Sequence, residues 1–213
     1  MSLRLSNERV EKKAMNFVKT GLISLCLVLS GRSVPAENLT HCEVSFSSSV
    51  YSASKKWCPV EAEQGYAQAQ YTLAHMYTFG IEFLEDYAIA LNWYLAAAEQ
   101  GHARAQYMAG FFFYNGYGTL KNNSEAVKWY ILASKQGEPD AQNQLAIMYG
   151  MGEGVLEDSV RAHMWANIAS VNGIEKAAKM RTKIASWMTS ADISEAQKMA
   201  RECMNSNYQN CGW

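Results

Sequence analysis

The sequence repeats itself at a fixed offset of 36 residues. Two series of glycines recur at this interval, and tryptophan recurs in the same register. The glycines are Gly65, Gly101, Gly137 and Gly173 in one series and Gly80, Gly116 and Gly152 in the other, and the tryptophans are Trp93, Trp129 and Trp165. A period of this length is typical of stacked helical hairpins, each of which buries its apolar side only against its neighbours. The sequence therefore predicts an all-α solenoid, a fold that mostly presents surfaces to other molecules.

Each copy contains two helical segments in which small and large side chains alternate. The first segment carries an Ala-Gln pair, such as Ala69-Gln70, and the second has alanines on both sides of its tryptophan. Alanine and glycine allow helices to approach closely, and aromatic rings fill the space between hairpins. The glycine after each segment stands where a helix C-cap requires a left-handed backbone. We therefore predict that the aromatic series is core and does not hold a cofactor.

Both ends of the array depart from the pattern. Trp57 and Ala62 are in register with the repeats, so we expect Ser52–Gln64 to be a remnant second helix that caps the N-terminal end. Pro59 should kink or split that helix. At the other end, a fourth copy degenerates after Gly173.

The segment beyond this degenerate copy predicts a terminal capping helix. Thr189-Ser190-Ala191-Asp192 is a capping box, which marks a helix N-terminus. The apolar face of the helix would consist of Ile193, Ala196, Ala200 and Met204, and its polar face of Glu195, Lys198, Arg201 and Glu202. One apolar and one polar side are what the last unit of a solenoid needs.

In this pattern of residues the chain resembles the SEL-one-like repeat (SLR) family, relatives of the tetratricopeptide repeats. The third copy carries the family residues Ala141, Leu145-Ala146, Tyr149, Gly152, Gly154-Val155, Asp158, Ala162, Trp165, Ala169 and Gly173. The resemblance covers about residues 62–190 and implies a right-handed α/α solenoid of about three full hairpins with degenerate capping repeats. It also implies a role in assembling other proteins. The family pattern contains no catalytic residue to carry over.

The N-terminal segment has the features of a secretory signal peptide. Lys19 precedes the apolar run 21–29, and Val34-Pro35-Ala36 is a small-residue cleavage site. The run is about half of the ~20 residues that span a bilayer. We expect cleavage after Ala36, with Met15 as a plausible true start; the alternative is an uncleaved membrane anchor.

The domain boundaries follow from the signal peptide and the repeats. We assign 1–36 to the signal peptide, 37–64 to the N-terminal segment and capping helix, 65–100, 101–136 and 137–172 to the three repeats, and 173–213 to the degenerate fourth repeat and capping helix.

Removal of the signal peptide makes the chain acidic. Residues 1–36 hold six of the 19 basic and two of the 20 acidic side chains, which leaves 13 basic and 18 acidic residues and a net charge of −5. An acidic chain without a basic stripe argues against a nucleic-acid partner. We expect no transmembrane helix in the mature chain, and a monomer.

Four cysteines follow the signal peptide, and none of them lies in the three full repeats. Cys42, Cys58, Cys203 and Cys211 form an even set, which in an exported protein suggests two disulfides. Three pairings are possible; proximity favours Cys42–Cys58 and Cys203–Cys211, each of which would pin one end of the array. No C-x-x-C spacing supports a metal site, so we expect neither a metal nor another cofactor.

The first helix of each copy has one side that is not used by the repeated packing residues. The positions on that side, four in each copy, are Gln68, Thr72, His75 and Phe79; Arg104, Met108, Phe111 and Asn115; Asp140, Gln144, Ile147 and Met151. The family resemblance places first helices on the concave surface. Exposed apolar residues rimmed by polar ones often mark partner sites, so we hypothesise that this stripe binds a peptide or helix. The alternatives are that a terminal segment covers the stripe or that it belongs to the core.

These observations favour a non-catalytic scaffold or regulator in the bacterial periplasm or envelope. A second interpretation is a weak hydrolase or binder of β-lactams or cell-wall material. Some cysteine-rich relatives in the family resemble such proteins, but the repeats of this chain lack the cysteine pair of those relatives. A third is a secreted effector that acts on a host. The sequence contains no G-x-S-x-G, H-E-x-x-H or Walker pattern in the mature chain.

Overall fold

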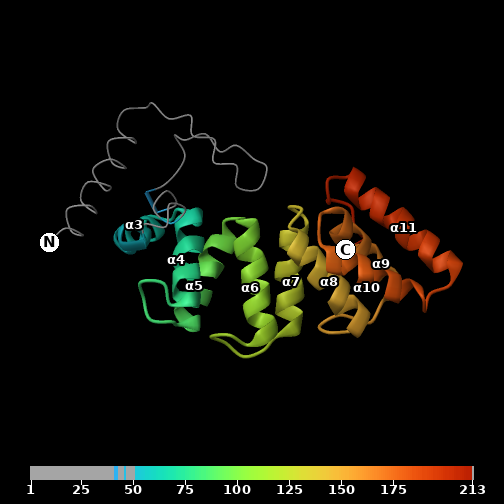
Figure 1. The fold of residues 1–213 in the computed structure, drawn as a ribbon, viewed down its shortest axis with the longest axis horizontal. Coiled ribbons are helices and arrows are strands. Elements are labelled where there is room, and N and C mark those ends of the chain that lie inside the picture. Colours follow the sequence, from blue (N-terminus) through green and yellow to red (C-terminus); the bar gives the residue numbers. More distant parts are fainter. Residues whose placement is uncertain (1–40, 43–45, 47–50, 213) are drawn as a thin grey trace.

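The computed structural model describes residues 41–42, 46 and 51–212 (Figure 1). The predicted signal peptide, its cleavage site and Met15 lie outside the described residues. Within them, nine helices follow one another without a strand, and no helix is both long and apolar enough to cross a membrane. The helices are α3 (Tyr51–Glu63), α4 (Ala67–Phe79), α5 (Tyr87–Glu99), α6 (Ala103–Asn115), α7 (Asn123–Ser134), α8 (Pro139–Met151), α9 (Ser159–Val171), α10 (Glu175–Ala185) and α11 (Ser190–Asn205).

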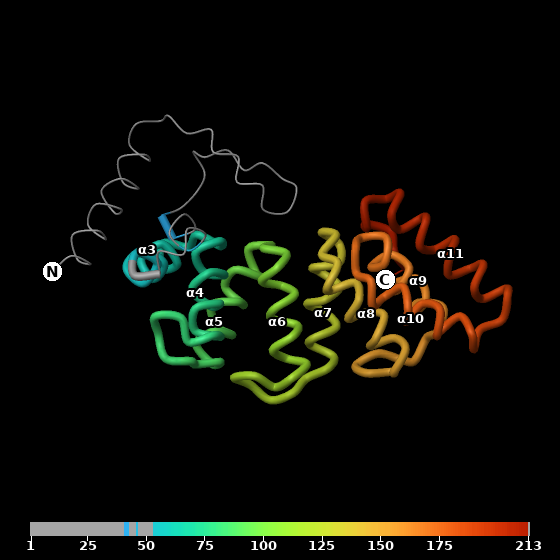
Figure 2. The backbone as a smooth tube through the Cα atoms, in the orientation of Figure 1, coloured from blue at the N-terminus to red at the C-terminus, as the bar shows by residue number. Residues whose placement is uncertain are grey.

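The helices form an elongated stack of antiparallel pairs, with α3 at one end and α10 and α11 at the other (Figures 1 and 2). The pairs α4–α5, α6–α7 and α8–α9 are the three predicted hairpins. Each second helix also packs on the first helix of the next pair, so every hairpin is held by its neighbours. The all-α solenoid expected from the 36-residue period is confirmed.

The repeated turn between the two helices of a hairpin is built from the same caps each time. Each first helix ends at a left-handed glycine, as Gly80 shows with a φ of 65°. Each second helix begins at an Asx side chain that accepts backbone N–H groups: Asp86 accepts from Ala88 and Ile89. These caps satisfy helix-end groups that would otherwise lack partners.

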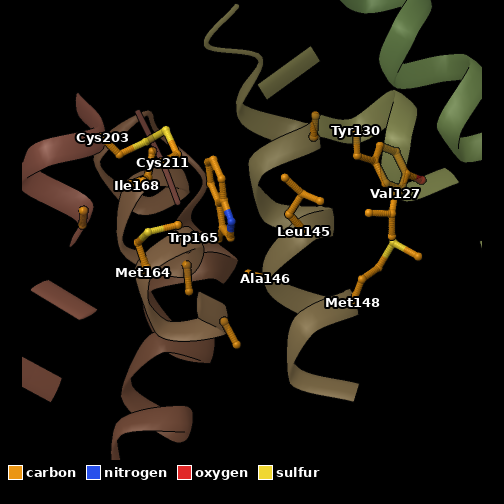
Figure 3. Packing of buried hydrophobic residues seen from close by; sticks show 14 of the residues in the cluster. Val127, Tyr130, Leu145, Ala146, Met148, Met164, Trp165, Ile168, Cys203 and Cys211 are labelled. Atoms are coloured by element: carbon orange, nitrogen blue, oxygen red, sulfur yellow. A yellow bond between two sulfur atoms is a disulfide. The ribbon is translucent and has the colours of Figure 1, made fainter. Parts of the chain in front are cut away.

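The core of the stack depends on close approach between small residues and rings. Tyr130 is fully buried, and its ring lies so close to Gly110 that a Cβ there would be 2.7 Å from the ring carbons. In the third hairpin, Trp165 is 1% exposed and fills the space between α9 and α8, near Leu145 (Figure 3). The predicted alternation of small and large residues thus explains how the helices pack.

A buried glutamine connects each of the first two hairpins to its neighbours, whereas Gln142 of the third accepts from Asn172 but has no hydrogen-bond partner for its amide nitrogen among the described residues. The side-chain amide of Gln106 donates to the Ala98 carbonyl oxygen at the end of the preceding hairpin, at 3.1 Å. Its oxygen accepts from the Gln136 amide at the end of its own hairpin, at 2.8 Å. Gln70 makes the same two contacts one repeat earlier. The Gln of the Ala-Gln pair is therefore a joint between repeats.

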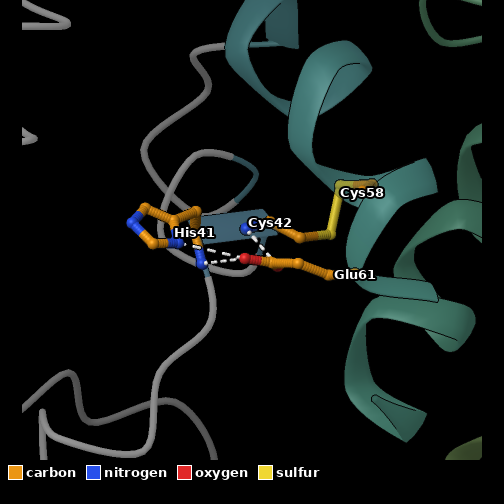
Figure 4. A network of polar contacts seen from close by, with 4 residues as sticks. All are labelled: His41, Cys42, Cys58 and Glu61. Atoms are coloured by element: carbon orange, nitrogen blue, oxygen red, sulfur yellow. Dashed lines mark hydrogen bonds and ion pairs between the residues drawn. A yellow bond between two sulfur atoms is a disulfide. The ribbon is translucent and has the colours of Figure 1, made fainter. Parts of the chain in front are cut away.

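The N-terminal end is closed by α3 and a disulfide between Cys42 and Cys58. Pro59 lies inside α3, which continues through it, so of the two predicted effects the split is wrong. The neighbouring disulfide and the packing of α3 on α4 hold this segment in place. The buried carboxylate of Glu61 accepts from the backbone N–H groups of His41 and Cys42 at 3.0 and 2.9 Å (Figure 4).

The C-terminal end is closed by α11, which packs along α9. Thr189 caps α11 as predicted, accepting from the backbone N–H of Asp192. The predicted apolar face of α11 is buried or half-buried, while its predicted polar face is exposed. The disulfide Cys203–Cys211 folds the chain back behind α11. Tyr208 there donates to the Asn172 side-chain oxygen at 3.2 Å, so the tail closes the end of α9.

The second glycine of the repeated turn gives a test of how the repeats stack. Gly118 and Gly101 both have positive φ, but a Cβ on Gly118 would lie 2.4 Å from the Tyr87 carbonyl oxygen, whereas nothing lies within 4 Å at Gly101. We expect Gly101→Ala to lower the free energy of unfolding by about 1 kcal/mol, and Gly118→Ala by roughly 2–4 kcal/mol, because only the latter also pushes two repeats apart. Urea denaturation followed by circular dichroism measures both values. Equal losses would contradict the proposed contact.

Candidate partner-binding face

The predicted stripe lies on α4, α6 and α8, and we refer to its twelve residues together as the first-helix face. Most of its members are half-buried or exposed, so their side chains remain within reach of a partner. Thr72 is the exception. It is 3% exposed, and its hydroxyl donates to the Gln68 carbonyl oxygen one turn earlier, so Thr72 is removed from the face.

At the N-terminal ends of these helices, polar groups join the first two repeats. Nε2 of His102 lies 2.9 Å from the side-chain oxygen of Gln68, and the ring of Tyr71 stacks on that of His102 with 4.8 Å between centroids. Nδ1 of His102 accepts from the backbone N–H of Ala105 and so caps α6. An accepting Nδ1 requires the proton of the neutral ring to be on Nε2, which then donates to Gln68. The sequence analysis did not identify Tyr71 or His102 as part of this surface.

A single exposed cation lies at the centre of this polar surface. Burial raises the pKa of Tyr71, and the adjacent Arg104 guanidinium partly offsets the shift. Burial likewise raises the pKa of Glu138, which Arg104 also opposes. The pKa of Tyr107 is raised to about 12, mainly by burial and then by the carboxylates of Asp140 and Glu138. Arg104 of the second repeat is therefore near Tyr71 of the first and Glu138 at the start of the third.

At the C-terminal ends of the same helices the face is apolar and open. Phe79 is 59% exposed and Met151 is 66% exposed. Asn115 lies between them in register, and its amide donates to the Phe111 carbonyl oxygen at 2.8 Å. Trp187, which is 36 residues after Met151, is 72% exposed. The sequence analysis missed Trp187 because the fourth copy was treated as degenerate, although the period itself locates it.

The middle of the face is more deeply packed than expected. Met108 and Phe111 are partly buried and pack against the core cluster around Phe112. Ile147 is also half-buried. These three side chains therefore contribute to stability as well as to the surface, and Phe79 and Met151 are the apolar members most available to a partner.

The terminal segments leave most of the first-helix face uncovered by described residues. The capping helix α11 packs mainly on α9, a second helix. At the N-terminal end, the ring of Phe46 meets His75 edge-on at 5.5 Å. His75 also lies 4.5 Å from Phe79 between ring centroids. Phe46 of the N-terminal segment therefore contacts the face at His75.

This architecture of stacked hairpins defines a helical-repeat protein. The sequence matches the Sel1 repeat family at residues 67–102, 103–138 and 139–173. The chain belongs to this family, whose members are generally protein–protein interaction scaffolds and typically non-catalytic. The matched units begin two residues after the boundaries expected from the glycines.

Solved structures of similar proteins show the same fold. A Sel1 repeat protein from Oxalobacter formigenes is 33% identical over 59% of this chain and 95% of its own, with a TM-score of 0.55. A protective antigen present in uropathogenic Escherichia coli strains, which displays an SLR fold, is 27% identical over 94% of this chain, with a TM-score of 0.66. The match covers 41% of that antigen's own chain. No curated protein matches the sequence.

The cap made by His102 predicts that stability depends on pH. Burial lowers the pKa values of His75, His102 and His163 in the folded protein. Below pH about 6.5 the histidines of the unfolded chain take up protons, whereas the buried histidines of the folded protein remain neutral to lower pH. The free energy of unfolding therefore falls as the pH falls. We expect His102→Asn, which can cap a helix but does not titrate, to reduce the fall between pH 7.5 and 5.5 by about 1 kcal/mol.

Urea denaturation at the two pH values provides the measurement. Above pH 7 the variant keeps an N-cap but loses the Gln68 hydrogen bond and the Tyr71 stacking, so its free energy of unfolding should be lower by about 1 kcal/mol, and the informative quantity is the change between the two pH values. An unchanged pH dependence in the variant would show that His102 does not couple protonation to folding.

Proposed function

We propose that this protein is a non-catalytic scaffold or regulator of the bacterial periplasm or envelope, and that its first-helix face binds a peptide or helix of a partner protein. The observation that carries the proposal is the division of this face into two ends. One end offers polar groups joined across three repeats around Arg104, and the other offers the exposed side chains of Phe79 and Met151.

The two ends suit different parts of one ligand. Arg104, with Glu138 and Asp140 nearby, supplies charges that can orient a polar segment and exclude wrongly charged ones. Phe79 and Met151 supply apolar surface, and Met adapts to differently shaped apolar partners. An amphipathic helix, which has one apolar side and one polar side, would match these two ends of the face.

An oxidising compartment is supported by the cysteines. Cys42–Cys58 and Cys203–Cys211 are bonded at the two ends of the array. Disulfides persist in exported proteins and are rare where thiols are kept reduced. Together with the signal-like N-terminus, this pairing supports export.

Export predicts a defined mature N-terminus. When the full chain is expressed in a Gram-negative bacterium, the periplasmic protein should begin at Glu37 and have both disulfides formed. Mass spectrometry of the intact protein, before and after reduction and alkylation, measures both features. A cytoplasmic product that retains Met1 or Met15, with alkylatable thiols, would contradict this prediction.

Partner binding at the first-helix face predicts position-specific crosslinking. A photo-crosslinking amino acid placed at Phe79 or Met151 should trap the same envelope protein in living cells. Val171 on α9 provides the matched control, because it is also apolar and 64% exposed but lies on a second helix. Ser substitutions at Phe79 and Met151 should abolish recovery of the partner without changing the thermal midpoint. Equal crosslinking from Val171, or undiminished recovery with the Ser variants, would contradict the assignment.

A further inference from the structure

Eight positions carry the same residue in all three repeats, and seven of them have a structural role. Two are the glycines with positive φ after each helix, three are fully buried alanines, one is the Gln joint and one is the packed Trp. The eighth is a leucine in the loop between the two helices of each hairpin. Its three copies are Leu84, Leu120 and Leu156, which we call the leucine ridge.

The leucine ridge is almost fully exposed. Leu84 is 91%, Leu120 88% and Leu156 90% exposed, so none of them contributes to the core. A single exposed leucine is ordinary on a protein surface. An invariant leucine in three loops, whose flanking positions differ from repeat to repeat, requires another explanation. The preceding residues are Phe83, Thr119 and Val155, and the following ones are Glu85, Lys121 and Glu157.

The loops that carry the ridge are fixed in the same way each time. Backbone N–H groups of Ile81 and Asp86 donate to carbonyl oxygens of α4, and the equivalent groups do so in the other two loops. Gly118 lies against the start of α5, and Gly154 against the start of α7. All three loops lie along one edge of the stack, the lower edge in Figures 1 and 2. The three leucines are therefore held in a row with one repeat between neighbours.

The charges around the ridge decide which partner it fits. The three loops, residues 80–86, 116–122 and 152–158, contain six carboxylates and one lysine. The acidic residues are in the two outer loops; Asp158 is paired with Arg161, while Glu82, Glu85 and Glu157 are exposed. An anionic membrane surface would be repelled by these carboxylates. Two copies pairing ridge to ridge would bring acidic outer loops together in either direction, which opposes self-association.

We propose that the leucine ridge is a second docking surface, and that its partner is a cationic amphipathic segment of another protein. Apolar side chains in one row would cover the three leucines, and flanking Lys or Arg residues would pair with Glu82, Glu85 and Glu157. This surface uses none of the twelve residues of the first-helix face, although its loops follow directly on the ends of α4, α6 and α8.

Two labelled synthetic amphipathic helices with the same leucine face, one with Lys and one with Glu on the polar side, test the proposal by fluorescence anisotropy. The wild-type protein should bind the Lys peptide at least roughly tenfold more tightly than the Glu peptide. The triple variant Leu84→Ser, Leu120→Ser, Leu156→Ser should weaken Lys-peptide binding at least roughly tenfold. A control triple variant with Ser at Val60, Leu132 and Val171, which are exposed elsewhere, should bind normally.

The ridge variant should keep the wild-type circular dichroism and thermal midpoint, because its leucines are solvent-exposed. Unchanged binding by the ridge variant, or equal binding of the Glu peptide, would overturn the proposal. Two further results would overturn the proposal. If the wild-type protein forms a dimer in sedimentation equilibrium and the ridge variant does not, the occupant is a second copy. If the wild-type protein co-sediments with anionic vesicles and the ridge variant does not, the occupant is a membrane. Crosslinks from Phe79 and Met151 should persist in the ridge variant, so failure here is distinguishable from failure at the first-helix face.

Discussion

The stack depends on one buried amide in each repeat. In the first two repeats the glutamine of the Ala-Gln pair donates to the end of the preceding second helix and, through its oxygen, accepts from the end of its own hairpin. In the third repeat Gln142 accepts from Asn172, but its amide nitrogen has no hydrogen-bond partner among the described residues. A buried amide left without partners costs about 1–3 kcal/mol, so the paired glutamines favour one placement of the first two hairpins on the helices that precede them. Apolar packing drives the association of hairpins, but it tolerates sliding; the glutamine supplies the directional contact that fixes the register.

The ends of the array depart from this rule, since an end hairpin has a neighbour on one side only. Trp93 and Trp129 are half-buried, whereas Trp165 is buried in the cluster that includes the Cys203–Cys211 disulfide. At the N-terminal end the carboxylate of Glu61 binds two backbone N–H groups beside Cys58. Covalent and charged contacts thus replace the missing repeat at each end, which is why the cysteines lie outside the 36-residue period.

The repeated residues made the fold predictable from the sequence, because each of them has one physical task that recurs. Glycine C-caps and the capping box of α11 rest on local backbone chemistry, and both are present. The absence of a split at Pro59 has a non-local cause, because tertiary contacts hold α3 helical where the local preference opposes it.

The surface was less predictable than the fold, because helical periodicity assigns a side but not a depth. Thr72 lies on the predicted side and is nevertheless buried, and Met108 and Phe111 are partly buried against the core cluster around Phe112. His102 and Tyr71 could not be identified as partners, because their contact depends on the offset between two repeats. The leucine ridge was visible in the sequence as a repeated residue, but only its exposure separates it from the packing positions.

The glutamine joints have a consequence for how such a chain can change over evolutionary time. The joints before α4 and before α6 use the same contacts, so the first two repeats are each held to the preceding helix in the same way. A duplication of 36 residues at either joint would lengthen the array and add one leucine to the ridge, while both termini kept their covalent closures. Proteins built in this way can therefore gain or lose whole binding positions by recombination, without an intermediate that fails to fold.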